Sequence, residues 1–269
     1  MHCKVEILSV GNELLLGNTI NTNATWIAAQ ATSVGADVSR ITTVGDNLSE
    51  ISGAVRESIR RAPNFLLLTG GIGPTFDDMT LMGVARALGR RTKVDPQAVS
   101  LIRTHYARRF KGKSITLTGP RLKMASIPVG GTSIPNPVGT APAVLLVVGR
   151  TEIFCLPGVP SEAKAIFQQS ILAKIRAKAS GRVYLEKWLK VSGIMESSLA
   201  PIIDRVMTHK PRVYIKSHPR GIEKNKAQIE LHFSKFSPSR ATGTRALRAA
   251  VEEMRSQLRR RGAKVGITR

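Results

Sequence analysis

The segment FLLLTGGIGPTFDDMT, residues 65–80, contains the pattern that decides the fold. Phe65–Leu68 is a short, continuous apolar run that ends in a glycine turn, which is typical of a buried strand. The spacing of apolar residues after the turn predicts a helix from about Asp77 to Leu88. The segment is therefore one strand, one glycine-rich turn and one helix, the repeating unit of an α/β sheet.

The same alternation extends back to the N-terminus. In chain order, the predicted elements are a strand Lys4–Val10, a helix Thr22–Val34, a strand Ala36–Val44 and a helix Leu48–Ile59. Parallel strands need crossover connections, so this order predicts an α/β fold, a three-layer α/β/α domain with a mostly parallel sheet. Ligands of such folds bind at the carboxyl ends of the strands, where we expect three loops to converge: Gly11–Gly17, Val44–Asn47 and Gly70–Asp77.

Towards the C-terminus the pattern is less regular. Helices are predicted at Pro96–Phe110 and Arg121–Ala125, and two apolar strands, Ala143–Val148 and Ile153–Leu156, flank a hairpin turn at Gly149-Arg150. Pro160–Lys178 is an amphipathic helix with proline at its start.

A composition change at Ala179-Ser180-Gly181 marks a domain boundary. We expect one domain over residues 1–178 and a small basic α+β domain over 182–269, since the elements beyond the boundary follow a β-α-β-β-α order. Those elements are a strand Tyr184–Val191, a helix Glu196–Met207, strands Arg212–Ser217 and Ala227–Phe233, and a helix Ala246–Arg261. The last helix has an apolar face, Leu247, Val251, Met254 and Leu258, to bury either on its own sheet or on a second subunit.

Composition indicates a globular protein, because 42% of the 269 residues are hydrophobic and 22% are charged. The N-terminus enters a strand pattern at once and no long apolar run follows, so neither secretion nor membrane spanning is expected. Cys3 and Cys155 lie in apolar runs, as buried free thiols of a cytoplasmic protein would.

Charge is unusual, with a net +23 from 41 Lys and Arg against 18 Asp and Glu. Residues 171–269 carry +16 of this excess. Such a field attracts phosphates, including those of nucleotides and nucleic acids. Only 4% of the residues are aromatic, however, so few stacking positions are expected, and we expect nucleic acid to bind only weakly and without sequence specificity.

The glycine-rich turn is the strongest candidate site. Gly70, Gly71 and Gly73 leave backbone N–H groups accessible before a helix N-terminus, which suits an anion, although tight-turn geometry alone explains them equally well. Asp77 and Asp78 follow, and carboxylates beside a phosphate need a divalent cation, with Mg²⁺ or Mn²⁺ preferring oxygen ligands. Alternatively, Thr75 and Asp78 have the spacing of a helix capping box.

Six ordered motifs extend this pattern to a family resemblance. Together they resemble the N-terminal portion of the competence/damage-inducible CinA family, which has the molybdopterin-binding fold shared with molybdenum-cofactor biosynthesis proteins. The motifs are Ser9–Gly17, Asn21–Asn23, Val44–Asn47, Thr69–Thr80, Pro135–Pro142 and Leu156–Glu162. The chain departs from the family pattern at Val159 and Ala163. It ends about where the deamidase domain of many members would begin, so deamidation is not expected.

The resemblance implies a homodimeric, metal-dependent nucleotide pyrophosphatase that hydrolyses ADP-ribose to AMP and ribose 5-phosphate with Mg²⁺, Mn²⁺ or Co²⁺. Asp77 and Asp78 would be metal ligands, and Asp46 and Lys164 would join them in catalysis. The expected substrate-binding residues are Glu13, Gly70, Gly71, Gly73, Thr75, Asn136, Gly139, Thr140, Pro157, Gly158 and Ser161.

Several of these residues have a plainer structural role open to them. Asp46 can cap the helix that begins near Leu48, Glu13 can bind the backbone of its own loop, and Ser161 can cap the following helix. Lys164 in a first helical turn opposes the helix dipole, which favours a phosphate contact.

Two other functions stay open. The shared fold permits a molybdopterin-binding or adenylyl-transfer protein of the molybdenum-cofactor type, because the same turn accepts a pterin phosphate. A non-catalytic nucleic-acid-binding protein would use the basic C-terminal domain, through Arg255, Arg259, Arg260 and Arg261.

Overall fold

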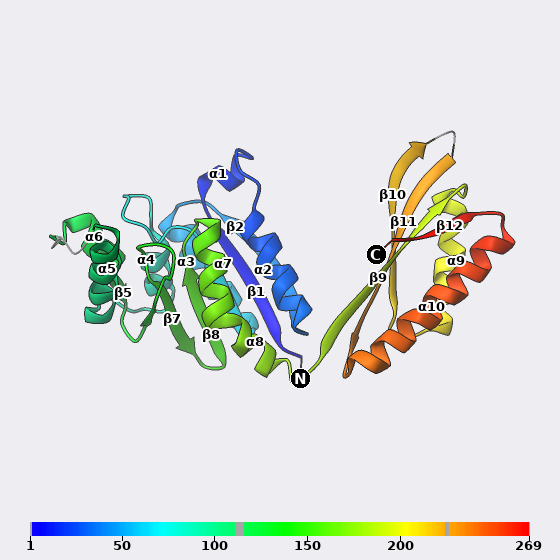
Figure 1. The fold of residues 1–269 in the computed structure, drawn as a ribbon. Helices are drawn as coiled ribbons and strands as arrows, with labels where there is room; N and C mark the ends of the chain where they lie inside the picture. The colour runs from blue at the N-terminus through cyan, green and yellow to red at the C-terminus, as the bar shows by residue number, and fades with distance from the viewer. Residues whose placement is uncertain (1, 111–115, 224–225, 269) are drawn as a thin grey trace. The chain divides into compact units, whose positions relative to one another are not determined.

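The computed structural model describes residues 2–110, 116–223 and 226–268. The chain divides into two compact units, one of residues 1–32 and 36–179 and the other of residues 33–35 and 180–269 (Figure 1). Within the described residues, no helix combines the length and apolar character needed to cross a membrane.

A six-stranded mixed sheet forms the centre of the first unit. Its order is β2 (Asp37–Val44), β1 (Lys4–Val10), β3 (Phe65–Thr69), β8 (Thr151–Leu156), β7 (Ala143–Val148) and β6 (Thr132–Ile134). The first four strands are parallel, and β7 and β6 are antiparallel to their neighbours. The predicted α/β fold is therefore confirmed, including the hairpin between β7 and β8, where Gly149 has a φ of +56°.

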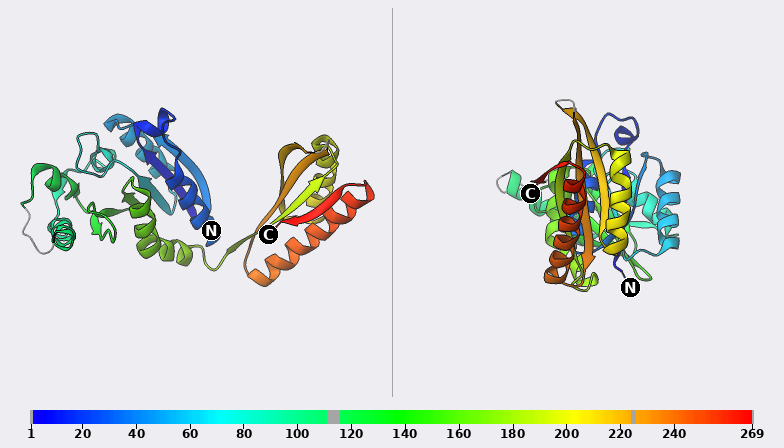
Figure 2. Two further views of the ribbon diagram at one scale, coloured as in Figure 1. Left: turned by 45° about the horizontal axis from the view of Figure 1, so that its top comes forward. Right: turned by 90° about the vertical axis from the view of Figure 1, so that its right-hand side faces the viewer.

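Helices cover both faces of this sheet (Figures 1 and 2). Leu66 and Leu68 of β3 pack into the cluster formed with α3 (Leu48–Arg61), α4 (Thr80–Ala87) and α5 (Pro96–Arg109). On the other face lie α2 (Thr22–Ser33) and a long helix built from α7 (Pro160–Ile166), the π-helical turn η1 (Phe167–Ile171) and α8 (Leu172–Lys178). Trp26 of α2 meets Phe167 edge to face, with ring centroids 5.5 Å apart.

Three short strands and one short helix in this unit were not expected: α1 (Asn12–Leu15), β4 (Thr92–Val94), β5 (Ser126–Pro128) and β6. The helix predicted at Arg121–Ala125 is present as α6 (Gly119–Met124) and begins two residues earlier. The helix predicted from Asp77 begins instead at Thr80, because the preceding residues form a separate turn. The predicted helix Pro160–Lys178 is continuous but includes the π-helical turn.

The second unit is an antiparallel sheet in the order β10 (Tyr214–Glu223), β11 (Lys226–Ser237), β9 (Val183–Ser192) and β12 (Lys264–Thr268). Helices α9 (Glu196–His209) and α10 (Arg240–Arg260) pack together on one side of it (Figure 1). The strand β12 was missed by the sequence analysis. Leu247, Met254 and Leu258 of α10 are buried within this unit's own core, so the helix's apolar face gives no argument for a second subunit.

Both cysteines, Cys3 and Cys155, are buried free thiols, as expected. Burial raises the pKa of Cys3 to about 11 and that of Cys155 to about 12, so both stay protonated at neutral pH.

A buried carboxylate on β1 is held by α3. Glu6 is 4% exposed and accepts hydrogen bonds from Ser58 Oγ and from Arg61 Nε and Nη2, each at 2.8 Å. Burial alone would raise the pKa of Glu6, but the hydrogen bonds of Arg61 and Ser58 outweigh it and hold the pKa below 4.5. This ion pair joins α3 to β1 of the sheet.

We predict that Arg61→Ala lowers the free energy of unfolding at pH 7 by about 3 kcal/mol, because it leaves the buried Glu6 carboxylate with Ser58 as a donor but without its cation. The folded-state pKa of Glu6 is depressed in the native protein, so the pair's contribution is present at neutral pH and is lost as the pH falls below 4.5. Urea unfolding should therefore show a difference between the two proteins that shrinks in acid. Arg60→Ala, an exposed neighbour, is the control, and an equal loss in both variants would contradict the prediction.

Candidate functional site

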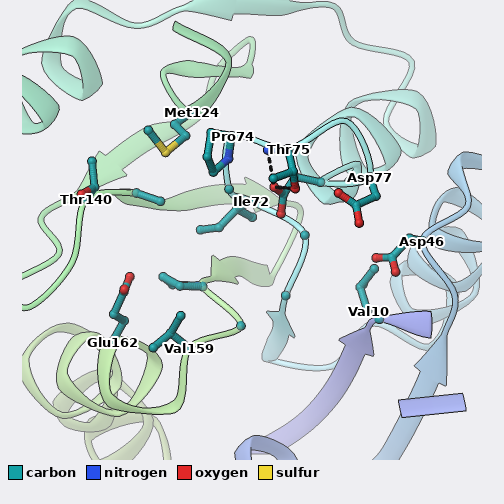
Figure 3. Close-up of a pocket in the computed structure, with 18 of the residues that line it drawn as sticks. Val10, Asp46, Ile72, Pro74, Thr75, Asp77, Met124, Thr140, Val159 and Glu162 are labelled. Carbon is teal, nitrogen blue, oxygen red and sulfur yellow. Dashed lines mark hydrogen bonds between the residues drawn. The ribbon is translucent and has the colours of Figure 1, made fainter. Parts of the chain in front are cut away.

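A cavity of about 540 Å³ opens at the carboxyl ends of the parallel strands (Figure 3). The three loops expected to converge do so here, since Gly11 and Glu13, then Asp46, then the turn from Gly70 to Asp78 all line it. Nine further lining residues come from these loops and from four other segments: Val10, Tyr106, Met124, Thr140, Ala141, Pro157, Gly158, Val159 and Glu162.

The glycine turn enters the cavity with its backbone bare. Gly70 has a φ of +98°, and a Cβ there would lie 2.2 Å from the carbonyl oxygen of Val10. Gly71 has a φ of +64°, and a Cβ there would lie 2.4 Å from Thr80 Oγ1, which donates to the Gly70 carbonyl at 2.8 Å. The turn therefore needs glycine both for its conformation and for its close contacts.

Residues 75–78 form a second turn. Asp78 Oδ2 accepts from the backbone N–H of Thr75 at 2.8 Å and from its hydroxyl at 2.5 Å, and Asp78 N–H donates to the Thr75 carbonyl. This pairing has the form of a capping box, but it closes a turn ahead of the helix, whose first residue is Thr80. The prediction that Asp78 pairs with Thr75 is therefore confirmed, but the prediction that this pair caps the helix is wrong.

The Asp77 side chain is more exposed than that of Asp78. It is exposed, and hydrogen bonding with Thr75 and with its own backbone, together with the charge of Lys123, lowers its pKa below 3.8. Lys123 Nζ donates to the Thr75 carbonyl. Asp77 is therefore an ionised carboxylate at neutral pH, available at the cavity mouth.

Asp46 belongs to a reciprocal pair between two loops. Its Oδ2 accepts from Asn12 N–H at 2.8 Å, and its own N–H donates to Asn12 Oδ1 at 3.2 Å. The helix α3 is capped instead by Asn47, whose Oδ1 accepts from the N–H groups of Ser49 and Glu50. The alternative of Asp46 as a helix cap was therefore wrong. Asp46 and Asp77 lie on the same side of the cavity (Figure 3).

Glu162 lies on the opposite side, with Thr140 (Figure 3). Asn136 Nδ2 donates to Glu162 Oε2 at 2.6 Å, while Asn136 Oδ1 accepts from Gly139 N–H at 2.8 Å. A Cβ on Gly139 would lie 2.0 Å from the Glu162 carboxyl carbon. Asn136 and Gly139, expected to bind substrate, thus position Glu162. Glu162 itself was missed as a site residue, although it ends the last of the six motifs.

Gly158 is fixed from a distant motif. Asn23 Nδ2 donates to the Gly158 carbonyl at 2.7 Å, so the α2 helix holds the loop that follows β8.

Four expected site residues do not line the cavity. Two are Asn136 and Gly139, which position Glu162, and the other two are Lys164 and Ser161. The amine of Lys164 lies 5.6 Å from the ring centroid of Trp26 of α2, which is a cation–π contact. Ser161 is exposed and does not cap α7, whose N-cap position is Val159 without a side-chain cap. Glu13 is exposed at the cavity edge, beside Gly11.

A second hollow, of about 620 Å³, shares Thr140 with the cavity. Its lining includes Asn136 and Gly139 together with His105, Arg108 and Arg109 of α5.

The cavity is acidic. Five carboxylates line it, those of Glu13, Asp46, Asp77, Asp78 and Glu162, and none of the lining residues described is a lysine, arginine or histidine. Among the described residues no three His, Cys, Asp or Glu side chains are grouped closely enough to hold a metal ion by themselves. A phosphate in this cavity would therefore need a cation that it binds jointly with one or two carboxylates, which is the usual arrangement for Mg²⁺.

The model of the family described as "Probable molybdopterin binding domain" matches residues 6–177, which include the whole cavity. The chain belongs to this family. Its molybdopterin-binding domain is similar to the crystal structure of CinA, a protein of unknown function, from Thermoplasma acidophilum. The two share 38% sequence identity and a TM-score of 0.59, over 65% of this chain and 98% of that one.

Relatives match along most of the chain. A protein of Aeropyrum pernix is 41% identical over 94% of this chain and 95% of its own length. Protein PAE0875 of Pyrobaculum aerophilum is 43% identical over 84% of this chain and 83% of its own. The similarity therefore includes part of the second unit as well as the molybdopterin-binding domain.

We predict that Gly70→Ala destabilises the molybdopterin-binding domain by about 3 kcal/mol or more, because the new methyl group meets the Val10 carbonyl in a left-handed backbone. The matched control is Gly89→Ala. Gly89 also has a positive φ, +62°, but no atom lies within 4 Å of its Cβ position, so the loss should be about 1 kcal/mol. Equal losses in thermal or urea unfolding would show that the close approach is unimportant.

Proposed function

We propose that the cavity binds a phosphorylated pterin of the molybdopterin type and that the chain transfers or removes an adenylyl group at that phosphate. One observation carries this proposal: the bare turn at Gly70 and Gly71 opens into a cavity whose lining carboxylates would have to share a cation with any phosphate bound there. Membership of the molybdopterin-binding family supports a pterin as the organic part of the ligand.

The donor set fits a hard divalent cation such as Mg²⁺, Mn²⁺ or Co²⁺. Asp77, with its lowered pKa, would hold it together with Asp46 or the second oxygen of Asp78, whose Oδ2 is already used by Thr75. Bound there, the ion would neutralise phosphate charge and polarise the phosphorus. The backbone N–H groups of the turn orient the phosphate, and Asn136 holds Glu162 towards the opposite end of the ligand.

The second candidate is a metal-dependent pyrophosphatase that hydrolyses ADP-ribose to AMP and ribose 5-phosphate. The observation in its favour is that residues from five of the six motifs shared with the CinA family meet around one cavity, among them Glu13, Asp46, Asp77, Thr140 and Glu162. Both candidates break or form a phosphoanhydride bond next to AMP, so the same groups serve either substrate.

The deciding experiment is to incubate the purified protein with ADP-ribose, NAD, FAD and adenylated molybdopterin, each with Mg²⁺, Mn²⁺ or Co²⁺, and to measure AMP. Release from adenylated molybdopterin alone supports the pterin proposal. Release from ADP-ribose with no pterin turnover replaces it with the second candidate, and no AMP from any substrate rejects hydrolysis of either phosphoanhydride.

We expect Asp77→Asn to slow AMP release at least about tenfold, a loss of about 1.4 kcal/mol in transition-state stabilisation, with unchanged thermal stability. The reason is that Asp77 is exposed, so its carboxylate is needed for the cation but not for the fold. Mn²⁺ affinity measured by calorimetry should fall in parallel. Asp204→Asn, an exposed carboxylate in the second unit, is the control, and an unaltered rate in Asp77→Asn removes that residue from the mechanism.

Asp78→Asn should differ by losing both activity and stability. Its carboxylate closes the turn through Thr75, and the weaker acceptor loosens that turn by about 1 kcal/mol. Activity is to be normalised to the folded fraction determined by circular dichroism. Normal activity per folded molecule would assign Asp78 to the turn alone.

A further inference from the structure

Among the described residues of the second unit, helices cover one face of the sheet, and no helix of that unit covers the other. Leu189 of β9 and Leu231 and Phe233 of β11 pack against α9 and α10. Successive side chains of a strand point to opposite faces, so the residues between them face away from both helices. We call this the open face: the even-numbered residues 184–190 of β9, 228–236 of β11 and 214–218 of β10, with Lys264 of β12.

Aromatic and imidazole rings gather on the two central strands of the open face. Trp188 and His232 are directly paired across β9 and β11, and their rings stack with centroids 4.2 Å apart and planes 16° apart. His218 of β10 lies 5.4 Å from Trp188, and its Nε2 is buried without a hydrogen-bond partner. Tyr184 and Phe236 form the next such pair, 5.1 Å apart.

Positive charge surrounds these rings. The two carboxylates of the open face are already paired, Glu186 with His232 at 2.9 Å and Glu230 with Arg220 at 2.7 Å. Lys190, Lys216 and Lys264 are exposed around them. The guanidinium of Arg182 lies 3.8 Å from the Phe236 ring centroid. The cations therefore exceed the anions beside the stacked rings.

A hollow of about 390 Å³ adjoins the ring cluster. Its lining includes Lys190 next to Trp188 on β9, Gln228 and Glu230 on β11, and Arg220 and Ile222 on β10. The hollow thus combines an exposed apolar side chain, hydrogen-bonding groups and two cations, which are the features that a flat heterocycle joined to a phosphate requires.

We propose that the open face binds single-stranded nucleic acid, with bases stacking beside Trp188 and on the Tyr184–Phe236 pair and with the backbone phosphates meeting Lys190, Lys216 and Lys264. Four-stranded sheets with aromatic side chains on their central strands bind unpaired bases in this way, since every base offers a ring face for stacking. A double helix hides its base faces, so it should bind less well. This surface differs from the α10 arginines considered from sequence, and it argues for tighter binding than composition suggested.

The binding test uses the full chain and fluorescein-labelled oligouridylate, oligothymidylate and a duplex, each about 12 nucleotides long. Fluorescence anisotropy at about 150 mM salt should give a Kd of about 1 μM or tighter for at least one single strand, and weaker binding to the duplex. The two single strands distinguish RNA from DNA. A Kd weaker than about 100 μM for both, or equal affinity for the duplex, overturns the proposal.

Variants locate the surface. Trp188→Ala should weaken binding at least about fivefold, and Trp188→Phe should restore it to within about threefold, because stacking needs a ring and not an indole N–H. Lys216→Ala should reduce the slope of log affinity against log salt by about 0.7, one released counterion, which a purely structural residue would not do. Arg255→Ala with Arg259→Ala is the control on α10. If only that pair weakens binding, the site is the helix and the proposal fails.

Fluorescence gives an independent readout. The chain has two tryptophans, and Trp26 packs on Phe167 in the first unit. In a Trp26→Phe variant the remaining emission comes from Trp188, and saturation with a single strand should quench it. Unchanged Trp188 emission at saturation would show that the single strand does not bind beside Trp188. A protein or peptide that binds the open face without displacing the oligonucleotide would show that this face has a different occupant.

Discussion

The close approach of two backbones at Gly70 organises the first unit. The N–H of Gly70 donates to the Leu156 carbonyl at 3.0 Å, while its α-carbon lies against the Val10 carbonyl, so three adjacent strands end at one point. Every loop that lines the cavity leaves the sheet from these ends or folds over them. A side chain at Gly70 would separate β1 from β3 and take the acidic loops apart with them.

That geometry concentrates negative charge in a chain that is strongly positive. The net charge is +23, yet the carboxylates collect where the parallel strands end and Lys164 is directed to a tryptophan outside the cavity. An anionic ligand is thus attracted by the overall field but enters the cavity only with a cation. The net positive charge of the chain therefore acts on the ligand at long range, whereas the negative charge of the cavity acts once the ligand is in contact.

Much of the fold follows from periodicity, which is why β1 begins and ends at the residues expected and why β1, β2 and β3 are parallel as predicted. Hydrogen-bond partners are another matter. Asp46 and Asn47 are adjacent in sequence, and either side chain could cap α3. The structure shows that Asp46 accepts a hydrogen bond from Asn12 and that Asn47 caps α3. Glu162 is held in the site by a hydrogen bond from Asn136, which is distant in sequence, so its role depends on the fold. The pairing of Trp188 with His232 likewise depends on strand register, which composition does not contain.

The π-helical turn at Phe167–Ile171 has a geometric consequence for the helix that covers the sheet. Phe167, Ile171 and Ile175 are all fully buried at four-residue steps, whereas a regular α-helix advances by 3.6 residues per turn, so such a stripe would drift about 40° around the axis at each step. The wider turn takes up one additional residue and rotates the stripe back towards the strands. The π-helical turn therefore sets which side of α8 faces the sheet. Regular winding of the same residues would instead rotate α8 against the sheet, which would carry Lys174 away from its 3.0 Å contact with Glu152.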